Sequence, residues 1–292
     1  MIIQHNIAAI NSYRNLGINQ SGLNKNLEKL SSGYRINRAG DDAAGLAISE
    51  SMRSQINGLN QATKNAQDAV GLIQTVEGAL TETHSMLQRL TTLASQSANG
   101  TYNSVARGNL NLEVEQLLKE IDRIANYTDF NGIKPIAGSV DGKMTFQIGP
   151  SKQETILVDK QAMTASFLGL DEDNVSGLGR SDTAWATATA TGRINVTTQT
   201  GGNLAIDRIN DAINLVSQYR AGLGAAQNRL EHTINNLKVT SENITAAESR
   251  IRDTDMADEI TAFTKNNILL QASQSMLAQS NSVPQSILSL IG

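Results

Sequence analysis

The residue types that carry catalysis or bind metals are few in this sequence, and they are widely spaced. The three histidines, His5, His84 and His232, form no H-E-x-x-H pattern, which would place two metal ligands on one helical face. The acidic clusters Asp41-Asp42 and Asp171-Glu172-Asp173 could bind a cation, but helix capping or a solvated loop is the more common role of such residues. Cysteine is absent, which removes disulfides, cysteine-ligated zinc and thiol nucleophiles. The sequence therefore predicts no catalytic residue, no metal site and no cofactor.

The composition favours thin helical bundles over a thick layered domain. Only 3% of the 292 residues are aromatic and 39% are apolar, so large side chains for a broad core are scarce. The net charge of -4 and the lack of a basic run give no reason to expect a nucleic-acid partner. We expect no membrane partner either, because no stretch reaches the roughly 18 apolar residues of a spanning helix. The first residues do not resemble a cleavable secretory signal.

One long helical stretch determines how the other elements are arranged, and these elements would position any functional side chain. A helix from about residue 42 to residue 98 would be roughly 80 Å long. Between Leu59 and Leu90, apolar residues recur at intervals of three and four positions and form one narrow stripe along the helix, which is the pattern of a coiled-coil seam. Other segments must therefore pack along this stripe. The seam positions are Leu59, Ala62, Ala66, Ala69, Ile73, Val76, Leu80, Thr83, Leu87 and Leu90.

Other helices can supply these partners. An N-terminal helix ends at Ser31-Ser32-Gly33, the segment Gly33–Gly40 forms a connector, and Asp41 or Asp42 caps the long helix. Asn99-Gly100 ends the long helix, and a second helix follows with the apolar positions Leu110, Val114, Leu117, Ile121 and Ile124. A later helix repeats every seven residues and is the natural partner of the long seam, with the apolar positions Ile209, Val216, Leu223, Leu230, Leu237, Ile244 and Ile251. Its intervening positions are mixed: Ile206, Ile213, Arg220, Gln227, Ile234, Ser241 and Glu248.

The middle of the chain has a period of two. Met144, Phe146 and Ile148 alternate with polar residues, and with Thr155–Val158 they predict a small β-hairpin. Arg193–Thr197 is a candidate for a further strand beside a small, exposed excursion. Together the patterns predict a mainly α fold: a long coiled-coil helical bundle with paired N- and C-terminal helices and a small central β-hairpin region.

The segment Leu30–Ser49, which reads LSSGYRINRAGDDAAGLAIS, resembles the signature of bacterial flagellin. The ends, Ile3–Leu16 and Leu277–Leu290, resemble the same family, and the likeness covers about Met1–Ile133 and Ala205–Gly292. The resemblance implies a structural subunit that self-assembles into the helical flagellar filament for motility. It also implies secretion by the flagellar type III export apparatus and an extracellular location on the bacterial flagellum.

The resemblance also orders the elements into nested domains. Residues 1–41 and 253–292 would form the inner-core helical domain, with the connector at its edge. Residues 42–170, which include the β-hairpins, and residues 204–252 would form the rod domain, and residues 171–203 a short variable excursion. The implied partners are other copies of the chain, hook-associated junction and cap proteins, and an export chaperone at the C-terminal helix. Alternatives are a hook–filament junction protein, which assembles as a short ring, and a flagellin-like carrier with an enzymatic insert.

The site residues that follow from these patterns fall into three groups. In the terminal helices we expect self-assembly through Ile3, Ile7, Ile10, Leu23, Leu27, Met256, Ile260, Phe263, Leu270 and Leu277. In the connector, we expect Arg35 and Arg38 to contact neighbouring subunits. The resemblance further implies a possible site for the innate receptor Toll-like receptor 5, on an exposed face formed by Gln88, Arg89, Leu93 and Glu113.

Overall fold

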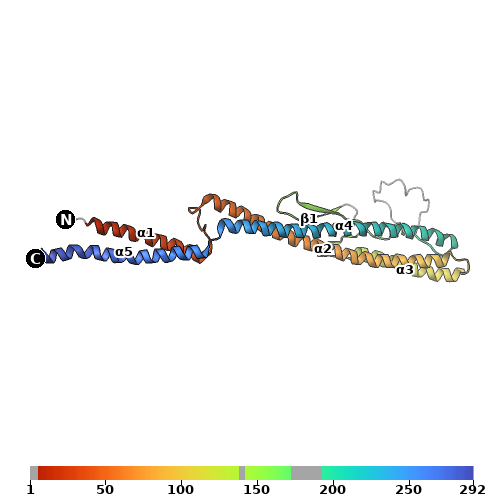
Figure 1. Ribbon diagram of the computed structural model, residues 1–292. Helices are drawn as coiled ribbons and strands as arrows, with labels where there is room; N and C mark the ends of the chain where they lie inside the picture. Colours follow the sequence, from red (N-terminus) through yellow and green to blue (C-terminus); the bar gives the residue numbers. More distant parts are fainter. Residues whose placement is uncertain (1–5, 138–141, 172–192, 292) are drawn as a thin grey trace. The chain divides into compact units, whose positions relative to one another are not determined.

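The computed structural model describes residues 6–137, 142–171 and 193–291, with side chains up to residue 283. The described chain is mainly helical with one two-stranded antiparallel sheet, which confirms the predicted fold class (Figure 1). None of its helices is long and apolar enough to cross a membrane. The elements are α1 (Ile7–Ser32), α2 (Ala43–Ala98), α3 (Ser104–Tyr127), β1 (Lys143–Gln147), β2 (Thr155–Asp159), α4 (Gln199–Arg252) and α5 (Met256–Ile291).

The chain divides into two compact units. Unit 1 contains Met1–Asn57 and Thr240–Gly292, and unit 2 contains Gly58–Val239. The first turns of α2 and the last turns of α4 thus belong to unit 1, and the rest of both helices to unit 2. The domain ranges given above follow helix ends instead, at residues 41 and 253, and they stay a prediction for the assembled protein.

Each helix begins at a polar side chain that accepts a backbone N–H group of the first turn. Such caps satisfy donors that have no partner inside the helix. The capping residues are Asn6, Asp42, Asn103, Thr198 and Asp255, and they accept, at 2.8 to 3.1 Å, from Ala9, Gly45, Ala106, Gly201 and Ala257. The predicted role of Asp42 is confirmed. At the other end of α1, Gly33 has a φ of 74°, a left-handed conformation that glycine adopts without strain.

The predicted seam of α2 is the centre of unit 2. All ten of its positions between Leu59 and Leu90 are buried, and the buried stripe continues to Leu93, Ala94 and Ser97. Helix α3 covers part of this stripe with Val114, Leu118, Ile121 and Ala125. Leu117 and Ile124, which the sequence analysis placed on the buried face of α3, are only half-buried.

Helix α4 packs on the same core with its seven-residue stripe from Ile209 to Leu237, as predicted. The intervening buried positions differ from the prediction by one residue: they are Ala205, Ala212, Tyr219 and Ala226. Three of these four residues are small alanines, whereas Ile206 and Ile213 are only partly buried and pack against the edge of the core. Near the start of α4, a Cβ on Gly202 would lie 2.9 Å from the backbone nitrogen of Ala98, so only glycine permits this approach.

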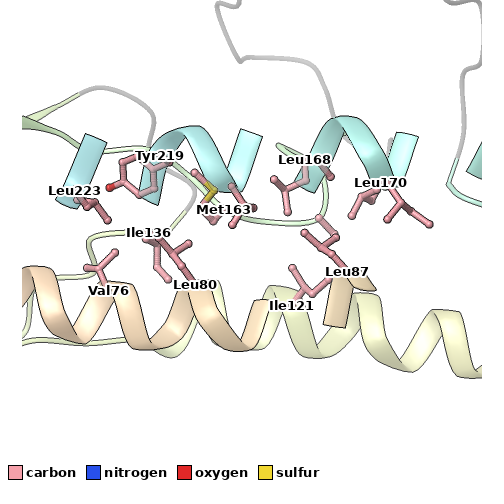
Figure 2. Packing of buried hydrophobic residues seen from close by; sticks show 14 of the residues in the cluster. Val76, Leu80, Leu87, Ile121, Ile136, Met163, Leu168, Leu170, Tyr219 and Leu223 are labelled. Carbon is pink, nitrogen blue, oxygen red and sulfur yellow. The ribbon is translucent and has the colours of Figure 1, made fainter. Parts of the chain in front are cut away.

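Segments without regular structure complete the core. Ile136, Met163, Leu168 and Leu170 are almost fully buried, and Figure 2 shows their side chains between α2 and α4. The Met163 N–H group donates to the Ile136 carbonyl at 3.0 Å, which ties two of these segments together. The middle of the chain therefore contributes large side chains to the core as well as the β-hairpin.

The β-hairpin pairs β1 with β2 in the register Phe146↔Ile156, as expected from the alternation. Two side chains attach it to the helices. The Asn65 amide donates to the Gln147 carbonyl at 3.1 Å, and the Tyr219 hydroxyl donates to the Asp159 carbonyl at 3.2 Å. Burial raises the pKa of Tyr219 to about 12, so its hydroxyl keeps the proton that it donates.

The prediction of a strand at Arg193–Thr197 is wrong. Among the residues that the structure describes, this segment pairs with no strand, because side chains of α2 and α3 take up its backbone groups: Val196 N–H donates to Asn111 at 3.2 Å, and the Ser97 hydroxyl donates to the Val196 carbonyl. Ile194 and Val196 are buried in the unit 2 core. The excursion of residues 172–192 lies outside the described residues.

The two ends that flank this excursion are joined. Ile194 N–H donates to the Leu170 carbonyl at 3.1 Å, and Arg193 lies 3.7 Å from the Asp171 carboxylate. Nearby, Asp122 of α3 accepts the buried Ala165 N–H at 2.7 Å. Burial raises the pKa of Asp122 and the Asp171 charge adds to this effect, but the carboxylate satisfies a backbone donor that would otherwise be costly. We refer to the paired ends, Leu170-Asp171 and Arg193-Ile194, as the neck.

The alanine stripe of α4 can be tested by adding volume. Ala212→Leu places three extra carbon atoms in a filled core, so we expect it to reduce the free energy of unfolding by about 1–3 kcal/mol. The exposed Ala225 of the same helix is the matched control, and Ala225→Leu should change it by less than about 0.5 kcal/mol. Urea unfolding followed by circular dichroism measures both. Equal effects of the two variants would contradict the assignment of Ala212 to the core.

Candidate assembly surfaces

The terminal helices α1 and α5 lie side by side in unit 1, as predicted (Figure 1). Their facing positions recur every three or four residues and are partly buried, like the seam of a coiled coil. Unlike the seam of α2, this seam mixes polar and apolar residues. It consists of Ala9, Ser12, Leu16, Asn19, Leu23, Asn26 and Leu30 of α1 with Phe263, Asn266, Leu270, Ser273, Leu277 and Ser280 of α5.

Polar contacts recur along the α1/α5 seam. The Asn19 amide donates to the Ser273 hydroxyl at 2.9 Å, and the Asn6 amide donates to the Ser280 carbonyl at 2.8 Å. At the other end, Lys29 lies 3.7 Å from Glu259. Because shifting one helix along the other would break all three contacts, they favour a single register of the pair.

The predicted self-assembly residues divide into two groups. Leu23, Phe263, Leu270 and Leu277 lie in the α1/α5 seam of the single chain. Ile7, Ile10, Leu27, Met256 and Ile260 are exposed, and Ile3 lies outside the described residues. Six further large exposed side chains were missed by following one stripe per helix, namely Tyr13, Ile18, Ile268, Leu269, Met276 and Val283. A count of apolar residues on every side of each helix would have found them. These eleven exposed residues are called the outer apolar residues below.

The connector is attached to the junction of α4 and α5 within unit 1. Backbone pairing joins Tyr34 to Asp253, and the Thr254 N–H donates to the Gly33 carbonyl at 3.0 Å. The Arg252 guanidinium stacks 4.7 Å from the centre of the Tyr34 ring and also lies 2.8 Å from Glu50. These contacts give the connector a defined conformation in the single chain.

Both connector arginines already have partners in their own chain. Arg35 donates through its guanidinium to the Ile251 carbonyl at 2.6 Å, and Arg38 pairs with Glu28 at 2.8 Å. Asp41 closes the turn by accepting the N–H groups of Arg38 and Asn37, and these two hydrogen bonds lower the pKa of the Asp41 carboxyl. Arg35 and Arg38 remain solvent-exposed, so contacts with a neighbour remain open to them.

The surface predicted for the innate receptor is only partly as expected. Arg89 is exposed and forms an ion pair of 2.7 Å with the partly exposed Glu113 of α3, and Gln88 is exposed beside Arg89. The expected exposure of Leu93 is wrong, because its side chain is 0% exposed and belongs to the unit 2 core. Its spacing of four from Arg89 did not reveal that this side of α2 faces the unit 2 core.

The described residues form no candidate metal site. No group of three or more His, Cys, Asp or Glu side chains gathers there in a way that could hold an ion. Asp41 and Asp42, the first acidic cluster, instead accept backbone N–H groups.

Comparison with known proteins points to one family. The family model described as the bacterial flagellin N-terminal helical region matches residues 3–141, and the one for the C-terminal helical region matches residues 206–291. The flagellin of Bacillus subtilis is 50% identical over the full length of both chains, and so is the flagellin of Halalkalibacterium halodurans.

A solved structure of a putative flagellar hook-associated protein from Vibrio parahaemolyticus is similar in fold, with a TM-score of 0.56. It is 14% identical, and the match covers 73% of this chain and 100% of that one. At this identity the likeness shows the fold alone. The full-length identities and the two family models show more: the chain belongs to the bacterial flagellin family, the structural subunits of the flagellar filament.

Proposed function

We propose that filament growth buries the outer apolar residues of α1 and α5 against neighbouring copies of the chain. The observation that carries the proposal is the exposure of eleven large apolar side chains among the described residues of one helix pair: Ile7, Ile10, Tyr13, Ile18, Leu27, Met256, Ile260, Ile268, Leu269, Met276 and Val283. Apolar surface of this extent usually marks an interface. Burying it on association would stabilise the assembled state by mass action.

The directions of these side chains favour a filament over a simple dimer. At about 100° per residue, Ile7 and Ile18 of α1 and Ile268 of α5 point away from the α1/α5 seam. Ile260 and Met276 lie on the two flanks of α5. A single partner could cover only one of these sides, so several neighbours are needed, as in a helical homopolymer. A hook–filament junction protein, the alternative, would instead stop at a short ring.

The remaining expectations belong to the same proposal. The subunit would pass through the flagellar type III export apparatus and function outside the cell as a non-enzymatic building block. Junction and cap proteins would bind at the filament ends. An export chaperone would cover the apolar side chains of α5 before assembly, since these would otherwise promote premature association.

The assembly proposal is tested at Ile268, which is exposed and distant from α1. Burying an isoleucine contributes about 1.5–3 kcal/mol, so Ile268→Asp should raise the critical concentration for polymerisation at least about tenfold. The measurement is salt-induced polymerisation of purified subunits, followed by light scattering and electron microscopy. Ile268→Leu keeps the apolar area and should polymerise normally, and Ile268→Asn separates lost burial from added charge.

Normal growth of Ile268→Asp filaments would refute an assembly role for this side of α5. Leu270→Asp acts at a different place, because Leu270 lies in the α1/α5 seam. We expect that variant to separate the two helices and to prevent growth, while the helices of unit 2 stay folded. Short rings in place of long filaments from the unmodified chain would favour the junction alternative.

The connector arginines are tested by charge reversal and by exchange. Arg35→Glu with Arg38→Glu should lower the temperature at which filaments dissociate, if both side chains contact neighbours. The exchange variant, Arg38→Glu with Glu28→Arg, retains the ion pair inside the chain, which as an exposed pair contributes only about 0–1 kcal/mol. Filaments of the exchange variant should therefore still be less heat-stable. Full recovery would mean that Arg38 serves only its own subunit.

We further propose that Arg89, Glu113 and Gln88 form a surface that Toll-like receptor 5 can bind. The double variant Arg89→Ala with Glu113→Ala removes both charges and should strongly reduce receptor signalling in a reporter cell, while its helix content is unchanged. The matched control is a second exposed ion pair of α3, Arg123 with Glu120 at 2.5 Å, whose alanine variants should signal normally. Leu93→Ala is unsuitable for this test, because the cavity it leaves would cost about 2–5 kcal/mol. Undiminished signalling by the Arg89 and Glu113 variant would remove the proposed surface.

A further inference from the structure

Three Asn-Gly pairs occur in the sequence: Asn57-Gly58, Asn99-Gly100 and Asn131-Gly132. An asparagine before glycine can deamidate without an enzyme. The backbone nitrogen of the glycine loses its proton and attacks the side-chain carbonyl carbon, ammonia leaves, and a five-membered succinimide ring remains. Water then opens the ring to aspartate or isoaspartate. Glycine favours the reaction because no side chain crowds the attacking nitrogen.

The fold restrains two of the three pairs. Asn57-Gly58 lies in the interior of α2, where helical hydrogen bonds hold the backbone. Ring closure requires the asparagine side chain and the next nitrogen to eclipse each other about the Cα–C bond. The helical backbone keeps them far from that arrangement, so closing the ring there would break the helix.

Asn131-Gly132 forms a tight turn. Its φ angles are 53° and 82°, and the flanking residues Phe130 and Ile133 exchange two backbone hydrogen bonds of 3.0 Å. Positive φ at both central residues is the conformation of a type I′ turn. This turn also holds the nitrogen of Gly132 away from the side chain of Asn131, and ring closure would break both hydrogen bonds.

Asn99-Gly100 differs from both. It follows the last residue of α2, and Asn99, Gly100 and Thr101 are all exposed to water. Within the part of the chain that the structure describes, the Gly100 N–H group donates no hydrogen bond. The side-chain oxygen of Asn99 accepts the Thr101 N–H at 3.3 Å, which polarises the carbonyl group that would be attacked.

A positive charge also acts on the attacking group. The Arg107 guanidinium donates to the backbone carbonyl of Asn99 at 3.0 Å, and its Nε donates to the Ser97 carbonyl at 2.9 Å. The Asn99 carbonyl and the Gly100 nitrogen belong to one peptide group. A cation at the oxygen therefore stabilises the anion that forms when the nitrogen loses its proton.

We propose that Asn99-Gly100 is a site of spontaneous deamidation, with Arg107 as the residue that activates the Gly100 nitrogen. The product carries a new carboxylate at the connection between α2 and α3. Where the ring opens to isoaspartate, the backbone gains one methylene group there. The modification needs no partner except water, so it would accumulate with the age of the subunit.

The test compares the three pairs within one molecule. The purified full-length chain is kept in warm, mildly alkaline buffer, and peptide mapping by mass spectrometry follows conversion at each asparagine. We expect Asn99 to convert at least about tenfold faster than Asn57 and Asn131, a modest difference in activation barrier. In concentrated urea the three rates should converge, since all three then lack structure. Similar rates in the folded chain, or an undiminished difference in urea, would overturn the proposal.

Two variants test the chemistry. A Cβ built on Gly100 meets no atom within 4 Å, so Gly100→Ala should fold normally and should slow conversion by crowding the nitrogen. Arg107→Gln should slow conversion several-fold in the folded chain but leave the rate in urea unchanged, because only the folded chain places the charge on the Asn99 carbonyl. Arg123→Gln, on the same helix, is the control and should have no effect. Unchanged conversion in folded Arg107→Gln, with its helix content intact, would remove the role assigned to the arginine.

Discussion

The narrow apolar seam of α2 is the constraint on which unit 2 depends. A helix of 56 residues cannot bury such a seam by itself, so other segments must cover it. Helices α3 and α4 do so over much of its length, and irregular segments add Ile136, Met163, Leu168 and Leu170 where the helices leave space. Polar residues of α3 hold segments of the middle region in place, as Asp122 does for Ala165 and Asn111 does for Val196.

Unit 1 follows a different principle. The α1/α5 seam alternates apolar residues with asparagine and serine, and many of its large apolar side chains face outward instead. A mixed seam specifies register at a cost in stability. Such a pair gains less from its own packing than the core of unit 2 does, and under the proposed function association would add the burial of the outer apolar residues. A mixed seam with large apolar side chains on the outside of the helix pair is the arrangement expected of a subunit that buries further apolar surface when it polymerises.

Periodicity predicted the helices well because their caps and apolar repeats agree over many turns, as in the stripe from Ile209 to Leu237. Periodicity gave wrong predictions where the packing of neighbouring segments decides which residue faces the core. Ala212 rather than Ile213 is fully buried, and Leu93 lies in the unit 2 core rather than on the exposed face beside Arg89. The strand expected at Arg193–Thr197 failed for a similar reason, since side chains of distant helices took its hydrogen bonds. Likewise, one stripe per helix could not reveal outer apolar residues on several sides of α1 and α5.

The neck has a consequence for how this chain can change in length. Because Leu170 and Ile194 are bonded to each other and Asp171 lies beside Arg193, the chain leaves unit 2 and returns to it at one place. The free energy of closing the chain between these two ends is therefore one term through which the length of the intervening sequence acts on the fold. Loop-closure entropy grows slowly, by about 0.6 kcal/mol for each doubling of length. Insertions between the two ends of the neck should thus cost the fold little, and evolution could vary the length there while the helices and their seams stay unchanged.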